Sequence, residues 1–366
     1  MRIPSLLDLE SEQRAVVDLP LHGSHVVTGT PGAGKSVLAV YRAWALATAG
    51  RRVALVTRAN LLHQYLAQLA PDLTEALQVT TYHLWVRAFW DRSFRSEPPR
   101  TDEEGWSYDW IEMQRECIER RARSNSHLVI DEGQNLPLGF YQLCRILGVG
   151  VTVFADENQL IHDDESTIAD ICRTLTPNTD PLVLWENRRN SREIATLASE
   201  FRVGTWSEVP IPARRGSTPA LLKVPSLRAF LTGVSRYFNA HPDRSIGIIC
   251  RSVRVLREAQ SELTALGLAK HTQAYVYDDP YRAAIDFSTQ PIRLLSTASM
   301  KGLEFDSVFV PDLDAYTEDP TGVAARLRLL LLCTRAREDL HFAHRGDQEP
   351  AILSGIPDSL LARHTG

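Results

Sequence analysis

Cysteine is scarce in this chain, and its spacing excludes two kinds of site. The 366 residues include five cysteines, and no two of them form a C-x-x-C pair. A disulfide framework or a zinc site would need cysteines at short, regular spacings. We therefore expect neither, and we expect buried thiols at Cys117, Cys144, Cys172, Cys250 and Cys333.

Long apolar runs are also missing. No run approaches the ~20 apolar residues that a membrane-spanning helix needs, and acidic residues near the start precede any signal-peptide core. We therefore predict a cytoplasmic protein with no membrane partner. The hydrophobic content of 44% is enough for large cores, and the chain is longer than one core usually holds, so two domains are expected.

An excess of positive charge is missing as well. The formal net charge is −5, whereas domains that bind nucleic acid are usually basic. Overall charge therefore gives no support for nucleic-acid binding, and a surface with that role would have to be a local patch.

A complete G-x-x-x-x-G-K-S loop runs from Gly29 to Ser36, between an apolar run at 25–28 and a helical pattern that continues to residue 49. In such a loop the backbone N–H groups surround the phosphates, Lys35 adds a cation, and the Ser36 hydroxyl can ligate Mg²⁺. The pattern predicts a nucleoside triphosphate, ATP, and Mg²⁺ as cofactors. The binding residues are Gly29, Thr30, Pro31, Gly32, Ala33, Gly34, Lys35 and Ser36.

A pair of carboxylates, Asp131 and Glu132, follows the apolar run at 128–130. Asp131 is a hard ligand suited to Mg²⁺, directly or through water. Glu132 is suited to orienting the attacking water, because phosphoryl transfer depends mainly on positioning and charge stabilisation. The alternative is an acidic pair that caps the next helix.

Short apolar runs alternate with helical patterns, as in a parallel sheet with crossover helices. The runs are 53–57, 78–81, 128–131, 151–154, 182–184, 246–250, 292–296 and 308–311, and later helices are expected at 253–266 and 323–336. Ligands bind at the carboxyl ends of the strands in such sheets, and the glycine loop, Asp131 and Glu132 all follow strands. The two series of runs predict one domain of residues 1–84 and 127–181 and a second of residues 182–366.

The segment 85–126 interrupts this alternation. It is rich in arginine and holds four of the seven tryptophans, Trp85, Trp90, Trp106 and Trp110. We interpret it as a small, partly helical insertion domain. Its aromatic side chains could stack on the bases of single-stranded DNA, serve as a docking face for a protein, or form a small core.

Further motifs follow in an order that resembles a known family. Residues 12–16, with Gln13, resemble a glutamine motif that reads adenine, residues 131–134 have the form D-E-x-Q, and residues 155–159 resemble G-D-x-x-Q. Residues 184–190 resemble L-x-x-N-Y-R-S, residues 301–306 read K-G-L-E-F-D, and residues 333–338 resemble L-T-R-A-R-E. With these motifs nearly the whole chain resembles the superfamily 1 helicases of the UvrD/Rep type, reduced to a motor core without the large accessory domain.

The resemblance implies an α/β fold of two RecA-like parallel-sheet domains, with a small insertion in the first. It implies an ATP hydrolase that moves along or unwinds DNA, with single-stranded DNA as a partner. Gln13 and Glu304 would then bind the nucleotide, Gln159 would contact the γ-phosphate, and Arg189 and Arg335 would stabilise the transition-state charge. The alternative for both arginines is a surface ion pair with a carboxylate.

Some positions depart from the family pattern. Arg188 replaces an aromatic residue that stacks on adenine, Ala298 replaces a histidine that contacts the strand, and acidic residues 163–165 follow Gln159. Because acidic groups repel phosphates, a second function stays open, an ATP-dependent conformational switch that regulates a partner protein without unwinding duplex. Motors this small also resemble, by fold analogy, subunits of bacterial anti-phage defence systems that work with a separate nuclease or effector chain.

Overall fold

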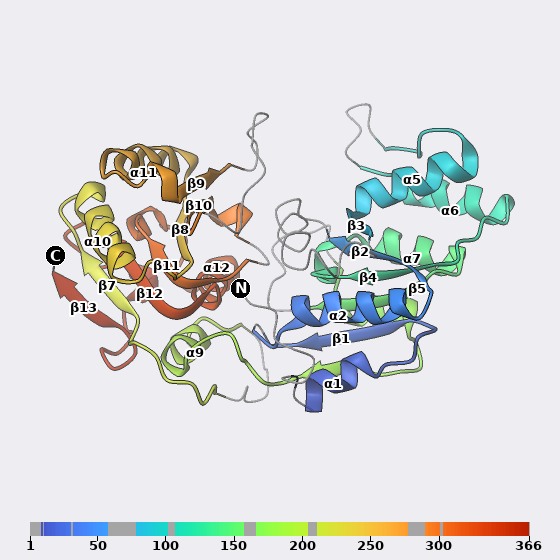
Figure 1. The fold of residues 1–366 in the computed structure, drawn as a ribbon, viewed down its shortest axis with the longest axis horizontal. Coiled ribbons are helices and arrows are strands. Elements are labelled where there is room, and N and C mark those ends of the chain that lie inside the picture. The colour runs from blue at the N-terminus through green and yellow to red at the C-terminus, as the bar shows by residue number, and fades with distance from the viewer. Residues whose placement is uncertain are drawn as a thin grey trace. The chain divides into compact units, whose positions relative to one another are not determined.

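The structure is a computed structural model that describes residues 9, 11–30, 32–57, 78–101, 107–156, 166–203, 211–276, 290–300 and 303–365. The chain divides into two compact units (Figure 1). The first unit contains the described residues of 2–30 and 34–185, and the second contains those of 31–33 and 186–366. Each unit is built on its own sheet.

In the described residues of the first unit the sheet has six strands, all parallel, in the order β3-β2-β4-β5-β1-β6. Its central strands are short runs rich in valine, isoleucine and leucine, as expected for strands buried on both faces. The strands are β1 (His25–Gly29), β2 (Arg52–Thr57), β3 (Gln78–Thr81), β4 (Ser126–Ile130), β5 (Gly150–Ala155) and β6 (Leu182–Leu184).

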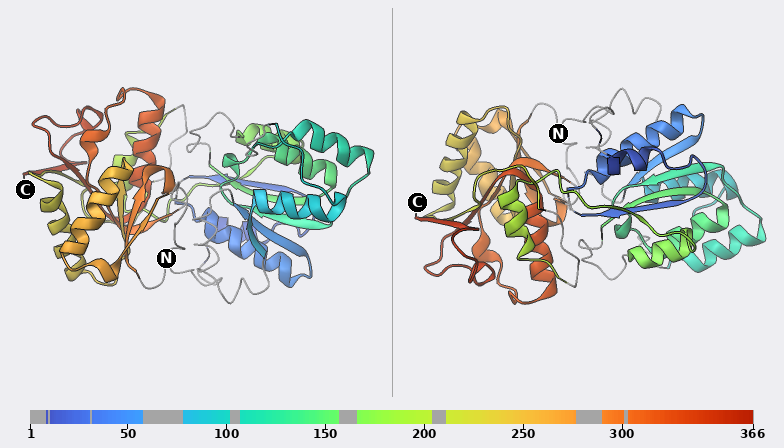
Figure 2. Two further views of the ribbon diagram at one scale, coloured as in Figure 1. Left: turned by 90° about the horizontal axis from the view of Figure 1, so that it is seen from above. Right: turned by 90° about the horizontal axis from the view of Figure 1, so that it is seen from below.

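Helices cover both faces of this sheet, with α2 on one face and α7 and α8 on the other (Figure 2). Several begin at side-chain caps that accept a hydrogen bond from a backbone N–H, such as Thr81 before α5 and Asp109 before α6. The helices of the unit are α1 (Ser11–Val17), α2 (Lys35–Thr48), α5 (Tyr82–Phe94), α6 (Trp110–Glu119), α7 (Leu138–Leu147) and α8 (Ile168–Leu175).

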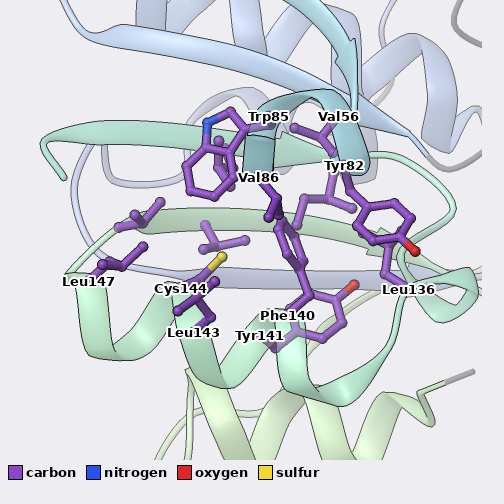
Figure 3. Close-up of a cluster of buried hydrophobic side chains, with 14 of the residues drawn as sticks. Val56, Tyr82, Trp85, Val86, Leu136, Phe140, Tyr141, Leu143, Cys144 and Leu147 are labelled. Atoms are coloured by element: carbon purple, nitrogen blue, oxygen red, sulfur yellow. The ribbon is translucent and has the colours of Figure 1, made fainter. Parts of the chain in front are cut away.

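The aromatic segment expected as an insertion contributes α5 and α6, and its side chains pack into the core of the first unit. Trp85 is buried in the same cluster as Phe140 of α7 and the strand residue Val56 (Figure 3). Trp90 is buried in this cluster as well. The rings of Trp85 and Phe140 pack edge to face, with 5.9 Å between their centroids. These aromatic residues therefore join the main core; Trp106 lies outside the described residues. The domain boundaries expected from the sequence stay a prediction.

The second unit, as far as the structure describes it, has a seven-stranded parallel sheet in the order β13-β7-β12-β11-β8-β10-β9. Its strands are β7 (Ala220–Lys223), β8 (Ile246–Cys250), β9 (Thr272–Tyr275), β10 (Ile292–Ser296), β11 (Phe305–Val310), β12 (Ala336–His344) and β13 (Ala362–Thr365). Its helices are α9 (Arg192–Ser199), α10 (Leu227–Ala240), α11 (Val253–Ala265) and α12 (Val323–Thr334). Leu231 and Val234 of α10 and Leu256 of α11 are buried against β8 in one cluster.

Two parallel sheets with crossover helices confirm the predicted α/β class with two RecA-like sheets. Four of the five cysteines are buried, as expected, while Cys172 is half-buried. Among the described residues, no helix has both the length and the apolar character needed to cross a membrane.

Candidate nucleotide-binding site

The glycine loop leaves the carboxyl end of β1 and leads into α2, as the sequence predicts. Gly29 and Gly34 have positive φ values of 153° and 87°, a conformation that favours glycine. A Cβ atom on Gly29 would lie 2.3 Å from the Leu184 carbonyl oxygen, so no larger residue fits there. On Gly34 it would lie 3.0 Å from the Gln13 amide nitrogen, which places Gln13 beside the loop. Pro31 lies outside the described residues.

Lys35 folds back over the loop. Its Nζ donates to the carbonyl oxygens of Gly29 at 2.7 Å and Thr30 at 2.9 Å. It also pairs with the Asp156 carboxylate, at the end of β5, at 3.3 Å. The ammonium group is therefore held by acceptors inside the loop, where phosphate oxygens would compete for the same protons.

Asp131 follows β4 and has one carboxylate oxygen without a protein partner. Its Oδ1 accepts the Glu132 N–H at 3.1 Å, whereas Oδ2 is buried and accepts no hydrogen bond. Burial, and then the charge of Glu132, raises the pKa of Asp131 to about 7, while Ser36 and Lys35 act in the opposite direction. A buried, unsatisfied carboxylate oxygen near a hydroxyl suits Mg²⁺, which prefers hard oxygen ligands. Asp131 and Ser36 would hold this ion.

The described residues contain no group of three or more His, Cys, Asp or Glu side chains arranged around a metal position.

Glu132 is held by a residue whose role the sequence analysis missed. Gln134 is fully buried, and its Nε2 donates to Glu132 Oε2 at 2.6 Å. Its Oε1 accepts the backbone N–H of Asp156 at 3.0 Å. Gln134 therefore links the carboxylate after β4 to the end of β5. The Q of the D-E-x-Q motif was the signal that could have identified it.

The expected catalytic arginines lie close together in the second unit. Arg189 Nε donates to Glu304 Oε2 at 2.5 Å, and its Nη1 donates to the Thr334 carbonyl at 3.4 Å. The neighbouring Arg335 is fully buried, and its guanidinium donates to the carbonyls of Leu331 and Leu303. Arg189 thus has a carboxylate partner, the alternative considered above, although the pair is largely buried and not a surface pair.

Several expected contacts cannot be placed. Gln159 lies outside the described residues, as do Lys301 and Gly302 of the late motif and the acidic run 163–165. Of the aromatic residues expected to stack on DNA, Trp90 is completely buried, so its ring offers no face to a base.

Comparison with known proteins adds a family match over part of the chain. Residues 12–164 match a family described as an AAA domain. No curated protein matches the chain. A crystal structure of the C-terminal domain of a possible DNA helicase from Lactobacillus plantarum WCFS1 is 21% identical, with a TM-score of 0.37, and the match covers 49% of this chain and 99% of that one.

The AAA match begins in α1 and includes the glycine loop and both carboxylates that follow β4. Residues 12–164, which hold the glycine loop and both carboxylates, are therefore similar to an AAA domain, and the rest of the chain lies outside this match.

Proposed function

We propose that this protein hydrolyses ATP with Mg²⁺. The observation that carries the proposal is the buried, unpartnered Oδ2 of Asp131, which lies in the same unit as the Lys35 loop and Ser36. Backbone N–H groups and Lys35 bind the phosphates, Ser36 and Asp131 hold the ion, and Glu132 orients the attacking water. A bound Mg²⁺ ion would supply charge neutralisation at the phosphates.

Five more residues have proposed roles at this site. Arg189 and Arg335 stabilise the charge that develops in the transition state, and Gln159 contacts the γ-phosphate. Gln13 beside Gly34 and Glu304 bind other parts of the nucleotide.

We further propose that hydrolysis drives movement on single-stranded DNA. The motif order supports this proposal, because residues 184–190, 301–306 and 333–338 resemble motor motifs of superfamily 1 helicases. Such a motor is stimulated by the strand it follows, and the stimulation weakens as salt rises because phosphate contacts release counterions.

A second candidate is a nucleotide-dependent switch that acts on a protein partner, such as a nuclease or effector. The specific observation is that Trp85 and Trp90 are buried, while three aliphatic residues on α5 and α6 are exposed. Leu84, Ile111 and Ile118 have 55%, 82% and 60% of their surface exposed, and such residues suit a protein interface more than a DNA groove.

Steady-state ATP hydrolysis with and without single-stranded DNA, over a series of salt concentrations, separates the two. The motor predicts stimulation by DNA that fades with salt. Hydrolysis indifferent to DNA at low salt would reject the motor and favour the switch. The variant Glu132→Gln measures the background, because it should not hydrolyse ATP. The variant Glu119→Gln makes the same charge change at an exposed residue on α6 and serves as its control.

A further inference from the structure

A pocket of about 430 Å³ lies at the end of the first sheet opposite the glycine loop. It is lined by residues at or just before the amino ends of β1, β4 and β5, including Ser24, His127 and Gly150. The glycine loop follows the carboxyl end of β1, so the five-residue strand His25–Gly29 separates the two places by roughly 15 Å. The pocket is therefore distinct from the nucleotide site.

The charged groups in the lining are all basic. Arg51 and Arg145 are exposed in the pocket wall, His22 lies beside them, and none of the lining residues is acidic. Within the part of the chain that the structure describes, neither arginine side chain has an ion pair. In a chain with 45 acidic and 40 basic residues, two unpaired arginines in one concave, acid-free site indicate an anion as the missing partner.

Two histidines at this end of the sheet, the buried His127 and the half-buried His25, also have positively charged neighbours. Burial lowers the pKa of His127 to about 3, and the charges of Arg42, His25 and Arg51 act in the same direction. Burial also lowers the pKa of His25, with Arg42 and His22 acting in the same direction against hydrogen bonds to backbone carbonyls. The charged neighbours named for these two pKa shifts are all basic.

The floor of the pocket is closely packed. His127 is buried, with Nε2 3.0 Å from the Thr152 hydroxyl, and a Cβ on Gly150 would lie 2.7 Å from its Nδ1. Because His127 is neutral and already hydrogen-bonded, the arginines supply the charge. Leu21 and Val149 add apolar surface to the same lining, which is the mixture of apolar wall and few polar groups typical of small-molecule sites.

We propose that this pocket binds a small organic phosphate, with the phosphate against Arg51 and Arg145 and the organic body against Leu21 and Val149. Arginine suits this group because its planar N–H donors match the phosphate oxygens. The volume lies within the 300–1,000 Å³ range of small-molecule pockets.

Isothermal titration calorimetry with adenosine 5′-monophosphate tests the site. The full chain carries Lys35→Ala, and Mg²⁺ is left out, so that the glycine loop does not contribute. We expect the monophosphate to bind at one site. The affinity for adenosine, which lacks the phosphate, should be at least tenfold lower. Arg51→Gln with Arg145→Gln should weaken the phosphate binding at least tenfold. Arg215→Gln with Arg236→Gln, which removes two exposed arginines of the second unit, should change it less than twofold.

The proposal is overturned if the monophosphate does not bind, if adenosine binds equally well, or if the control pair weakens binding as much as the pocket pair. A second measurement uses the unsubstituted chain and so does not depend on the folding of a variant. Phenylglyoxal modification, read by mass spectrometry, should be slowed at Arg51 and Arg145 by the monophosphate and not by adenosine. Equal modification with and without it would also overturn the proposal.

Discussion

Gln134 shows how a single buried amide can hold a proposed catalytic group in place. It donates to Glu132 and accepts from Asp156, so one side chain joins the ends of two neighbouring strands. Glu132 has φ of 54°, which is uncommon for a residue with a side chain. The carboxylate direction therefore depends on local hydrogen bonds and not only on its place in the sequence.

Replacement of Gln134 by Ala should lower ATP turnover roughly 10- to 100-fold, the range found when an orienting partner is removed. Nucleotide affinity should change less than threefold, because Lys35 and the loop amides are untouched. The test compares kcat and nucleotide affinity between Gln134→Ala and the unsubstituted chain. Gln142→Ala, which removes an amide that bonds to Gln114 near the surface, is the matched control. Unchanged turnover in Gln134→Ala would mean that Glu132 needs no such support.

Asp312 gives a prediction about pH. It follows β11, is fully buried, and accepts the Arg251 N–H at 3.0 and 3.2 Å. Burial raises its pKa from 3.8 to about 6. Between these values the folded chain binds more protons than the unfolded chain, so this group makes the free energy of unfolding decrease as pH rises from about 4 to about 6. The contribution is about 3 kcal/mol at most.

Asp312→Asn should remove this contribution. The stability of the variant relative to the unsubstituted chain should therefore increase between pH 4 and pH 7, by up to about 3 kcal/mol. Denaturant unfolding at a series of pH values measures it, with the exposed Asp243→Asn as control. A difference that stays constant with pH would show that Asp312 does not titrate in this range.

At the scale of elements, the apolar pattern predicted the positions of most of the described strands. The runs at 78–81, 182–184, 246–250 and 292–296 match β3, β6, β8 and β10 without a shift. The expected helix at 323–336 ends earlier, and β12 begins at Ala336. The start of this strand does not look apolar in the sequence, because it contains Arg337, Glu338 and Asp339. In the fold, two of these charges are paired: Arg214 pairs with Glu338 and Arg244 pairs with Asp339.

The start of α6 depends on a cap that the sequence shows clearly. Asp109 Oδ1 accepts the Glu112 N–H at 3.0 Å. Asp109→Ala should lower the free energy of unfolding by about 1 kcal/mol. Asp109→Asn keeps a hydrogen-bond acceptor and should lower it by only about a few tenths of a kcal/mol. Thermal or denaturant unfolding of both variants tests this, and equal losses would show that charge, and not the cap, matters at this position.

At the scale of the whole molecule, the sequence predicted two parallel-sheet units and the place of the glycine loop, because these follow from local patterns. It did not predict that Trp85 and Trp90 join the main core, because packing partners such as Phe140 are distant in sequence. It also missed the basic pocket, since Arg51 directly precedes β2 and Arg145 lies in α7 after β4, and these segments are brought together when β2 pairs with β4. Contacts between residues that are distant in the sequence cannot be predicted from local patterns in a single sequence.

The central claim is that the first unit hydrolyses ATP with Mg²⁺, and its most direct test is steady-state hydrolysis by the purified full chain. We predict turnover that disappears without Mg²⁺, is lost in Lys35→Ala, and is lost in Glu132→Gln while the latter still binds nucleotide. Glu119→Gln should keep full activity. Normal hydrolysis by Glu132→Gln, or no hydrolysis by the unsubstituted chain with or without single-stranded DNA, would contradict the account.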